Sequence, residues 1–97
     1  MNITVLGAAE RHLDEGYQWY EQQDPGTGDY FLRCVAAEIE SLRRFVGIHR
    51  KVHGLHRLNT AKFPFGIYYT VEADTITVRA VLDLRRSPAW IRRQLRH

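Results

Sequence analysis

The chain has 97 residues, the length of one small domain with a single core, and its 44% hydrophobic and 26% charged residues are near the globular average. These values exclude general disorder, and no apolar run approaches the roughly 18–20 residues of a membrane-spanning helix. One cysteine, Cys34, excludes an internal disulfide and a cysteine-rich zinc site. Met1–Leu6 has no signal-peptide pattern, so we expect a single cytoplasmic domain over residues 1–97.

The net charge of +3 is divided unevenly along the chain. Residues 1–48 carry four arginines and eight acidic residues, which gives −4. Residues 49–97 carry ten lysines and arginines and three acidic residues, which gives +7. A basic half favours a polyanionic or acidic partner, with simple solvation of exposed faces as the alternative.

The first half of the chain predicts a short edge strand and then a helical hairpin. Residues 3–6 are largely apolar, and Leu13, Tyr17 and Tyr20 recur at the spacing of one helix face. Asp24–Gly28 ends this helix, because proline and glycine favour turns. We therefore expect a five-residue turn between two antiparallel helices.

The second helix is predicted from a longer apolar stripe, and Gly47 is its expected end. The stripe comprises Phe31, Val35, Ile39, Leu42 and Phe45 or Val46. Cys34 lies beside this stripe, so we expect a buried or half-buried structural cysteine.

The second half predicts strands and a short helix. Residues 52–58 form a weak strand, and residues 63–71 a strand rich in aromatic and β-branched side chains. A turn over 72–74 leads to an alternating strand over 75–82, and Ser87–Pro88 caps a C-terminal helix. The residues expected on one face of the last strand are Ile76, Val78, Ala80 and Leu82.

These elements predict an α+β fold with a small antiparallel sheet. The helical hairpin is expected to cover one sheet face, because the apolar stripes of helices and strands need a shared core. The other face is then left to Arg57, Thr77, Arg79 and their neighbours. Tyr68 and Tyr69 point to opposite faces of their strand, so we expect one in the core and the other half-exposed.

Several pieces of the sequence, in their order and spacing, resemble the RelE/ParE superfamily of toxins. The pieces are Trp19-Tyr20-Glu21, Pro25–Gly28, His56-Arg57-Leu58, Phe63–Tyr69 and Ala80–Trp90. The resemblance covers roughly residues 3 to 93. It implies the same α+β fold and a small cytoplasmic toxin that a cognate antitoxin from the same operon neutralises.

The superfamily has two activities, and the residues favour one of them. RelE-like toxins are ribosome-dependent mRNA endoribonucleases without a metal, whereas ParE-like toxins inhibit DNA gyrase and are not enzymes. Gly66 stands where RelE-like toxins carry an arginine, and Asp83 where many relatives carry a histidine. No tyrosine follows Tyr69, and the one C-terminal histidine is His97. We therefore favour a gyrase inhibitor, with an endoribonuclease or a degenerate toxin that only binds antitoxin as alternatives.

The candidate partner-binding residues are basic. They are Arg57, Arg79, Arg85, Arg86, Arg92, Arg93 and Arg96. Arg57 and Arg79 are expected on neighbouring strands, and Asp83 is expected to form a local ion pair with the arginines that follow it. In the endoribonuclease alternative, Arg57, Arg79 and Arg86 hold the phosphate. In the ParE-like interpretation these arginines bind the target or an acidic antitoxin segment that folds on binding.

No cofactor or metal is expected. His49, His53 and His56 are spaced by four and three residues, which on a helix forms a metal-binding face. The segment is predicted to be a loop that enters a strand, where His53 and His56 point to opposite sides. We therefore expect solvated histidines.

Overall fold

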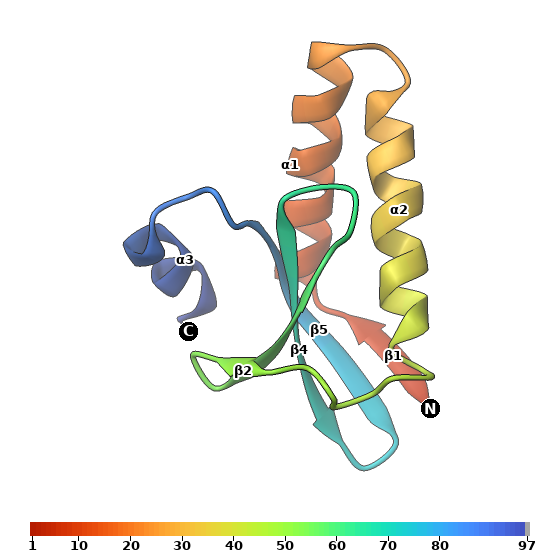
Figure 1. Ribbon diagram of the computed structural model, residues 1–97, viewed down its shortest axis with the longest axis vertical. Coiled ribbons are helices and arrows are strands. Elements are labelled where there is room, and N and C mark those ends of the chain that lie inside the picture. Colours follow the sequence, from red (N-terminus) through yellow and green to blue (C-terminus); the bar gives the residue numbers. More distant parts are fainter. Residues whose placement is uncertain (97) are drawn as a thin grey trace.

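The protein is described by a computed structural model that covers residues 1–96 (Figure 1). Its elements are β1 (Asn2–Val5), α1 (Gly7–Gln23), α2 (Thr27–Ser41), β2 (Lys51–Val52), β3 (Leu55–Asn59), β4 (Phe65–Glu72), β5 (Thr75–Asp83) and α3 (Pro88–Leu95). The expected α+β class, helical hairpin and C-terminal helix are confirmed. In the described part of the chain, every helix is too short or too polar to cross a membrane. His97, singled out in the sequence, lies outside the described residues.

The five strands form one sheet in the order β1-β5-β4-β3-β2. Strands β2 to β5 pair antiparallel, as expected, and β1 is an edge strand. β1 runs parallel to β5, with Ile3 opposite Ile76, so the sheet is mixed. Parallel neighbours need a long connection, which the helical hairpin and three strands supply here. β1 pairs with β5 only as far as Val78, so the outer edge of β5 has no strand partner beyond that residue.

The α1–α2 hairpin covers one face of the sheet and forms the main core with it (Figure 1). The predicted stripe is confirmed, since Phe31, Val35, Ile39 and Leu42 are buried. Of the two candidates for its end, Val46 packs on the core and Phe45 is 46% exposed. The half-buried Cys34 is a free cysteine, as expected.

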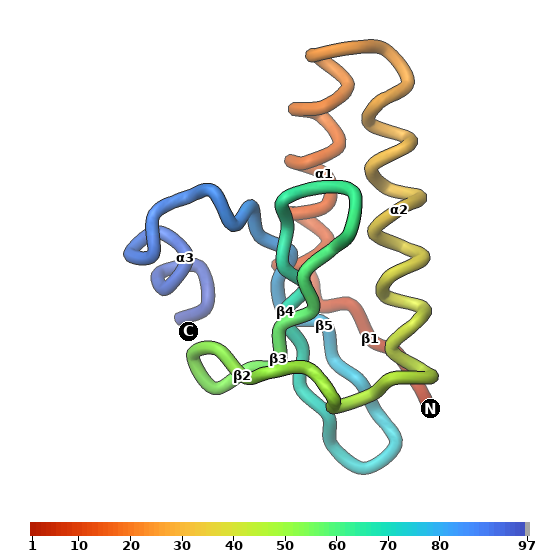
Figure 2. Tube along the Cα trace, viewed as in Figure 1, coloured from red at the N-terminus to blue at the C-terminus, as the bar shows by residue number. Residues whose placement is uncertain are grey.

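The limits of α2 differ from the sequence prediction at both ends. α2 ends at Ser41, not Gly47, and turns carry the chain on to β2 (Figure 2). The turn between α1 and α2 has three residues instead of five, because Gly26 adopts a left-handed conformation, with φ 94°, and the helix begins directly after it. The Glu21 carboxylate accepts hydrogen bonds from the backbone N–H groups of Gly26 and Gly28, each at 3.0 Å, and so closes the turn.

Glycines allow the two helices to approach closely. A Cβ atom at Gly16 would lie 2.6 Å from the Phe31 ring, and one at Gly28 would lie 2.8 Å from Tyr17. Tyr17 therefore packs against α2, whereas its stripe partners Leu13 and Tyr20 pack on the main core. The hairpin therefore depends on the glycines between its helices as well as on its apolar stripes.

The β4–β5 pair contains a β-bulge that changes which residues face the helices. Tyr68 pairs with Ala80, but Tyr69 pairs with Val78, so Arg79 is an extra residue in β5. Ile76, Val78 and Val81 therefore join the main core, whereas Ala80 and Leu82 face the opposite side. The expectation that residues 76, 78, 80 and 82 share one face is wrong, because one inserted residue inverts the alternation.

α3 covers the opposite face of the sheet and forms a second core. This core comprises Tyr68, Ala80, Leu82 and Ile91, with Val52, Leu55, Leu84, Trp90 and Leu95 packed around it. The expectation of polar residues on this second face is wrong, because α3 packs there on apolar side chains. Tyr68 and Tyr69 are both fully buried, one in each core, so the expected half-exposed tyrosine is wrong. The predicted cap is confirmed, since Ser87 Oγ accepts the Trp90 N–H at 3.1 Å.

The predicted weak strand over residues 52–58 is a tight β2–β3 hairpin. Its turn lies at His53 and Gly54, which both have positive φ angles of 55° and 81°. His53 is therefore a turn residue and not a strand residue. His56 stacks on Tyr69, and its Nδ1 bonds to the His49 carbonyl oxygen at 2.6 Å, while His49 Nδ1 contacts the Tyr69 hydroxyl. Two of the three histidines thus hold the loop on the sheet.

The close approach of the helices predicts that Gly16→Ala destabilises the protein. The added methyl group overlaps the Phe31 ring, and such overpacking costs about 1–3 kcal/mol of unfolding free energy. Gly7→Ala is the matched control, because its Cβ meets only Arg11 Nη1 at 3.9 Å. Urea denaturation of both variants measures the difference. Equal stability of the two variants would contradict the packing described here.

Candidate partner-binding surfaces

An open groove of about 490 Å³ lies between α1 and the turn that joins β5 to α3. Its aromatic lining is Trp19, Tyr20, Phe65 and Trp90, and its charged or titratable lining is His12, Glu15, Asp83, Arg85 and Arg86. The floor is the end of β5, Val81 to Asp83, where β1 no longer covers the strand edge. The groove therefore combines apolar surface with an unpaired strand edge.

Asp83 and Arg85 form the predicted ion pair at the end of the groove. Arg85 Nη2 lies 2.8 Å from Asp83 Oδ2, and its Nε and backbone N–H bind Oδ1 at 3.0 and 2.9 Å. Burial raises the pKa of Asp83, but these hydrogen bonds and the Arg85 charge outweigh it and hold that pKa below its usual value. Arg86 forms no ion pair within 4 Å in the described chain, but its charge also lowers the pKa of Asp83.

The arginines of the groove lie over its tryptophans. The Arg86 guanidinium is 4.0 Å from the Trp90 ring centroid, and that of Arg85 is 5.9 Å from Trp19. Such cation–π contacts contribute about 0.5–1 kcal/mol at exposed sites. Trp19 is nevertheless 50% exposed, which leaves a large apolar side chain available at the rim.

His12 caps one backbone N–H group, that of Val81, at the edge of β5 that β1 leaves uncovered, and no sequence signal singled it out. Its Nδ1 accepts a hydrogen bond from the Val81 N–H at 3.3 Å, so the imidazole occupies the position of a neighbouring strand. Burial lowers the pKa of His12, more than nearby Glu15 raises it, and the neutral form is favoured. Only the pairing of helix and sheet reveals this role.

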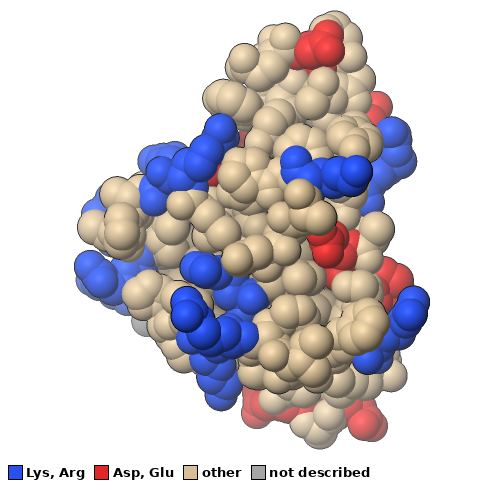
Figure 3. Space-filling model, viewed as in Figure 1, with Lys and Arg blue, Asp and Glu red and all other residues tan. Residues whose placement is uncertain are grey.

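A second surface, here called the basic face, is formed by β2–β3 and α3 (Figure 3). Its cations are Arg50, Lys51, Arg57, Arg92, Arg93 and Arg96. All are exposed except Arg57, which is half-buried. Among residues 1–96, the two ion pairs within 4 Å are Arg43–Glu40 and Arg85–Asp83, so the basic face has no paired carboxylate.

Arg57 and Arg79 are not on neighbouring strands, because β4 lies between β3 and β5. Arg57 stands opposite Tyr68 and crosses Gly66, where a Cβ atom would lie 3.0 Å from Arg57 Cδ. Arg79 is the bulge residue, and its Nε donates to Thr70 Oγ1 at 3.3 Å. The Arg57 side chain thus covers Gly66, the position at which RelE-like toxins carry an arginine.

The predicted arginines therefore divide into groups. Arg85 and Arg86 belong to the groove, Arg79 belongs to the bulge, and the remaining predicted arginines belong to the basic face. Among the described residues, no group of three or more histidine, cysteine or acidic side chains is arranged to hold a metal.

No protein-family model and no curated protein matches the chain. Among solved structures, the fold is similar to a chain of one described as "Chromosomal ParDE TA system from P. aeruginosa", with a TM-score of 0.78 and 19% sequence identity. The alignment covers 87% of this chain and 96% of that chain. The chain thus has the fold that its resemblance to the RelE/ParE superfamily implied.

The depressed pKa of His12 predicts a loss of stability in mild acid. Above about pH 6.5 the residue is neutral in both folded and unfolded states. As pH falls below that value the unfolded chain binds the proton first, so the unfolding free energy falls. His12→Asn keeps an acceptor for the Val81 N–H but does not titrate, and we expect a smaller loss between about pH 7 and 5.

The control for this experiment is His53→Asn in the exposed turn, where asparagine tolerates the positive φ. Urea denaturation at several pH values measures the slope for each variant. His49 also has a pKa lowered by burial and by the charge of His56, so part of the acid sensitivity remains in both variants. Equal pH slopes for His12→Asn and the parent protein would contradict the role of His12.

Proposed function

We propose that the protein is the toxin of a type II toxin–antitoxin pair and acts in the cytoplasm. The observation that carries the proposal is the fold similarity to a chain of a ParDE system over nearly the full length of both chains. The ordered sequence pieces that resemble the RelE/ParE superfamily support it independently, because a shared fold alone does not define function.

We propose DNA gyrase as the target rather than messenger RNA on the ribosome. A RelE-like site needs cations that stabilise the charge of the scissile phosphate and groups that move protons. Gly66 itself supplies no cationic side chain, and the aliphatic part of the Arg57 side chain packs over it. Asp83 is a carboxylate whose pKa is held below its usual value, and it is engaged by Arg85 instead of serving as a proton donor. These features support a binding inhibitor rather than a nuclease.

We propose that the groove beside α1 receives a segment of the cognate antitoxin. Trp19 and the edge of β5 beyond the His12-capped Val81 N–H favour an extended apolar segment, because a strand edge without a partner strand is a template for an added strand. The exposed guanidinium of Arg86 favours an acidic residue in that segment. A segment that folds on binding can cover such a surface with few residues.

The toxin assignment predicts growth arrest when the chain is expressed alone, and rescue when the product of the neighbouring gene is co-expressed. Purified protein is expected to block DNA supercoiling by gyrase in vitro. Full supercoiling at saturating protein would contradict the gyrase target. Codon-positioned mRNA cuts detected by primer extension would favour the endoribonuclease, and normal growth would indicate a chain that only binds antitoxin.

The antitoxin site predicts that Trp19→Ala and Arg86→Glu each weaken antitoxin binding about tenfold or more, as loss of a buried anchor does. Phe45→Ala and Arg44→Glu are matched controls, because Phe45 is similarly exposed, at 46% against 50% for Trp19, and lies outside the groove. Titration calorimetry measures the affinities. If the controls weaken binding as much as the groove variants, the antitoxin binds elsewhere.

A further inference from the structure

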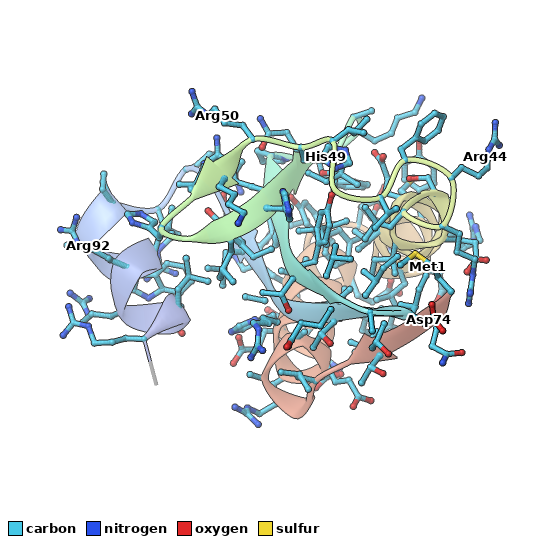
Figure 4. The ribbon with its side chains drawn as sticks, turned by 90° about the horizontal axis from the view of Figure 1, so that it is seen from below. Met1, Arg44, His49, Arg50, Asp74 and Arg92 are labelled. Carbon is cyan, nitrogen blue, oxygen red and sulfur yellow. The ribbon has the colours of Figure 1, made fainter. Side chains whose placement is uncertain are left out.

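The basic face joins two segments that are far apart in the sequence. Residues 49–59 and 87–96 contain six lysines and arginines and no acidic residue. They lie together because Val52 and Leu55 pack against the same second core as Ile91 and Leu95. The side-chain view shows Arg50 and Arg92 on the same side, opposite Arg44 (Figure 4).

The cations of the basic face are uncompensated. No carboxylate lies within 4 Å of any of them in the described chain, since the two ion pairs there involve Arg43 and Arg85. Gathering like charges on one surface raises the free energy of the folded protein unless a partner neutralises them. A net charge that is concentrated in this way indicates a polyanionic partner.

We propose that the basic face binds the phosphate backbone of duplex DNA. This inference goes beyond the proposed function, which requires no contact between the protein and DNA. Arginine and lysine side chains on neighbouring elements neutralise successive phosphates and release counterions, which drives binding without sequence specificity. Both elements are held in place: Ser87 caps α3 and Ile91 anchors it on the sheet, while Val52 and Leu55 pack β2–β3 against the second core.

The composition of the surface favours nucleic acid over an acidic protein segment. The cores of protein interfaces are apolar and rich in aromatic anchors, whereas nucleic-acid interfaces are more polar and strongly positive. The large apolar residues that are exposed in the described chain are Met1, Trp19, Tyr30, Phe45 and Ile48. None of them belongs to β2, β3 or α3, so the basic face offers charge without an apolar anchor.

The same surface favours a duplex over single-stranded RNA. Proteins bind single strands by stacking bases on exposed aromatic side chains. The aromatic residue in α3 is Trp90, which is half-buried and already covered by the Arg86 guanidinium at 4.0 Å. A surface that is rich in cations, and whose exposed aromatic ring is the single imidazole of His53, fits the regularly spaced phosphates of a double helix.

The test is the salt dependence of DNA binding by the full chain. Fluorescence anisotropy with a labelled duplex of about 20 base pairs, between about 50 and 200 mM salt, gives the slope of log K against log salt. With about four to six phosphates neutralised, we expect a slope of roughly −4 to −5. Arg92→Gln with Arg93→Gln is expected to reduce the magnitude of the slope by about 2 and to weaken binding about tenfold or more.

Arg43→Gln with Arg44→Gln is the matched control, an adjacent arginine pair that removes the same charge (Figure 4). Arg44 lies at the opposite end of the molecule from Arg92. We expect this variant to bind within about twofold of the parent protein. Thermal denaturation of both variants verifies that they are folded.

Several results would overturn the proposal. These are absence of duplex binding at about 50 mM salt, equal losses in the two double variants, and tighter binding of a single-stranded RNA of the same length. Competition by polyglutamate as effective as that by unlabelled DNA would identify an acidic protein as the partner instead. Gyrase inhibition is measured in a separate assay, so failure of the DNA-binding proposal would not contradict the toxin assignment.

Discussion

The bulge at Arg79 is the feature on which the two-sided packing of the molecule depends. β4 and β5 are buried on both faces, and each face demands apolar side chains from the same strand. The extra residue directs Val81 to the helical hairpin and Leu82 to α3, whereas strict alternation would exchange them. The orientation of the Val81 N–H toward His12 follows from it, and Val81 to Asp83 form the floor of the groove.

Packing on both faces also separates the two surfaces for which we propose partners. The groove lies between α1 and the β5–α3 turn, where β1 no longer pairs with β5 and Trp19 remains exposed. The basic face lies where α3 and β2–β3 share the second core. The groove and the basic face differ in chemistry. One small domain can therefore bind an apolar segment at one site and a polyanion at another.

The sequence predicted the elements with strong local patterns and missed features that arise between elements. The stripe from Phe31 to Leu42 and the existence of a strand over residues 75–82 were found because periodicity is a property of neighbouring residues. The bulge left no local signal. His12 could not be found either, because its hydrogen-bond partner lies 69 residues away.

The sequence by itself determined the α+β class, the helical hairpin, the β4–β5 pair and the uneven distribution of charge, because composition and periodicity encode them locally. Only the tertiary structure decided that α3 covers the second sheet face and that Arg57 crosses Gly66. It also divided the predicted arginines between a groove and a basic face. These outcomes depend on which surfaces lose water together when the chain folds, and that is decided by contacts between distant residues.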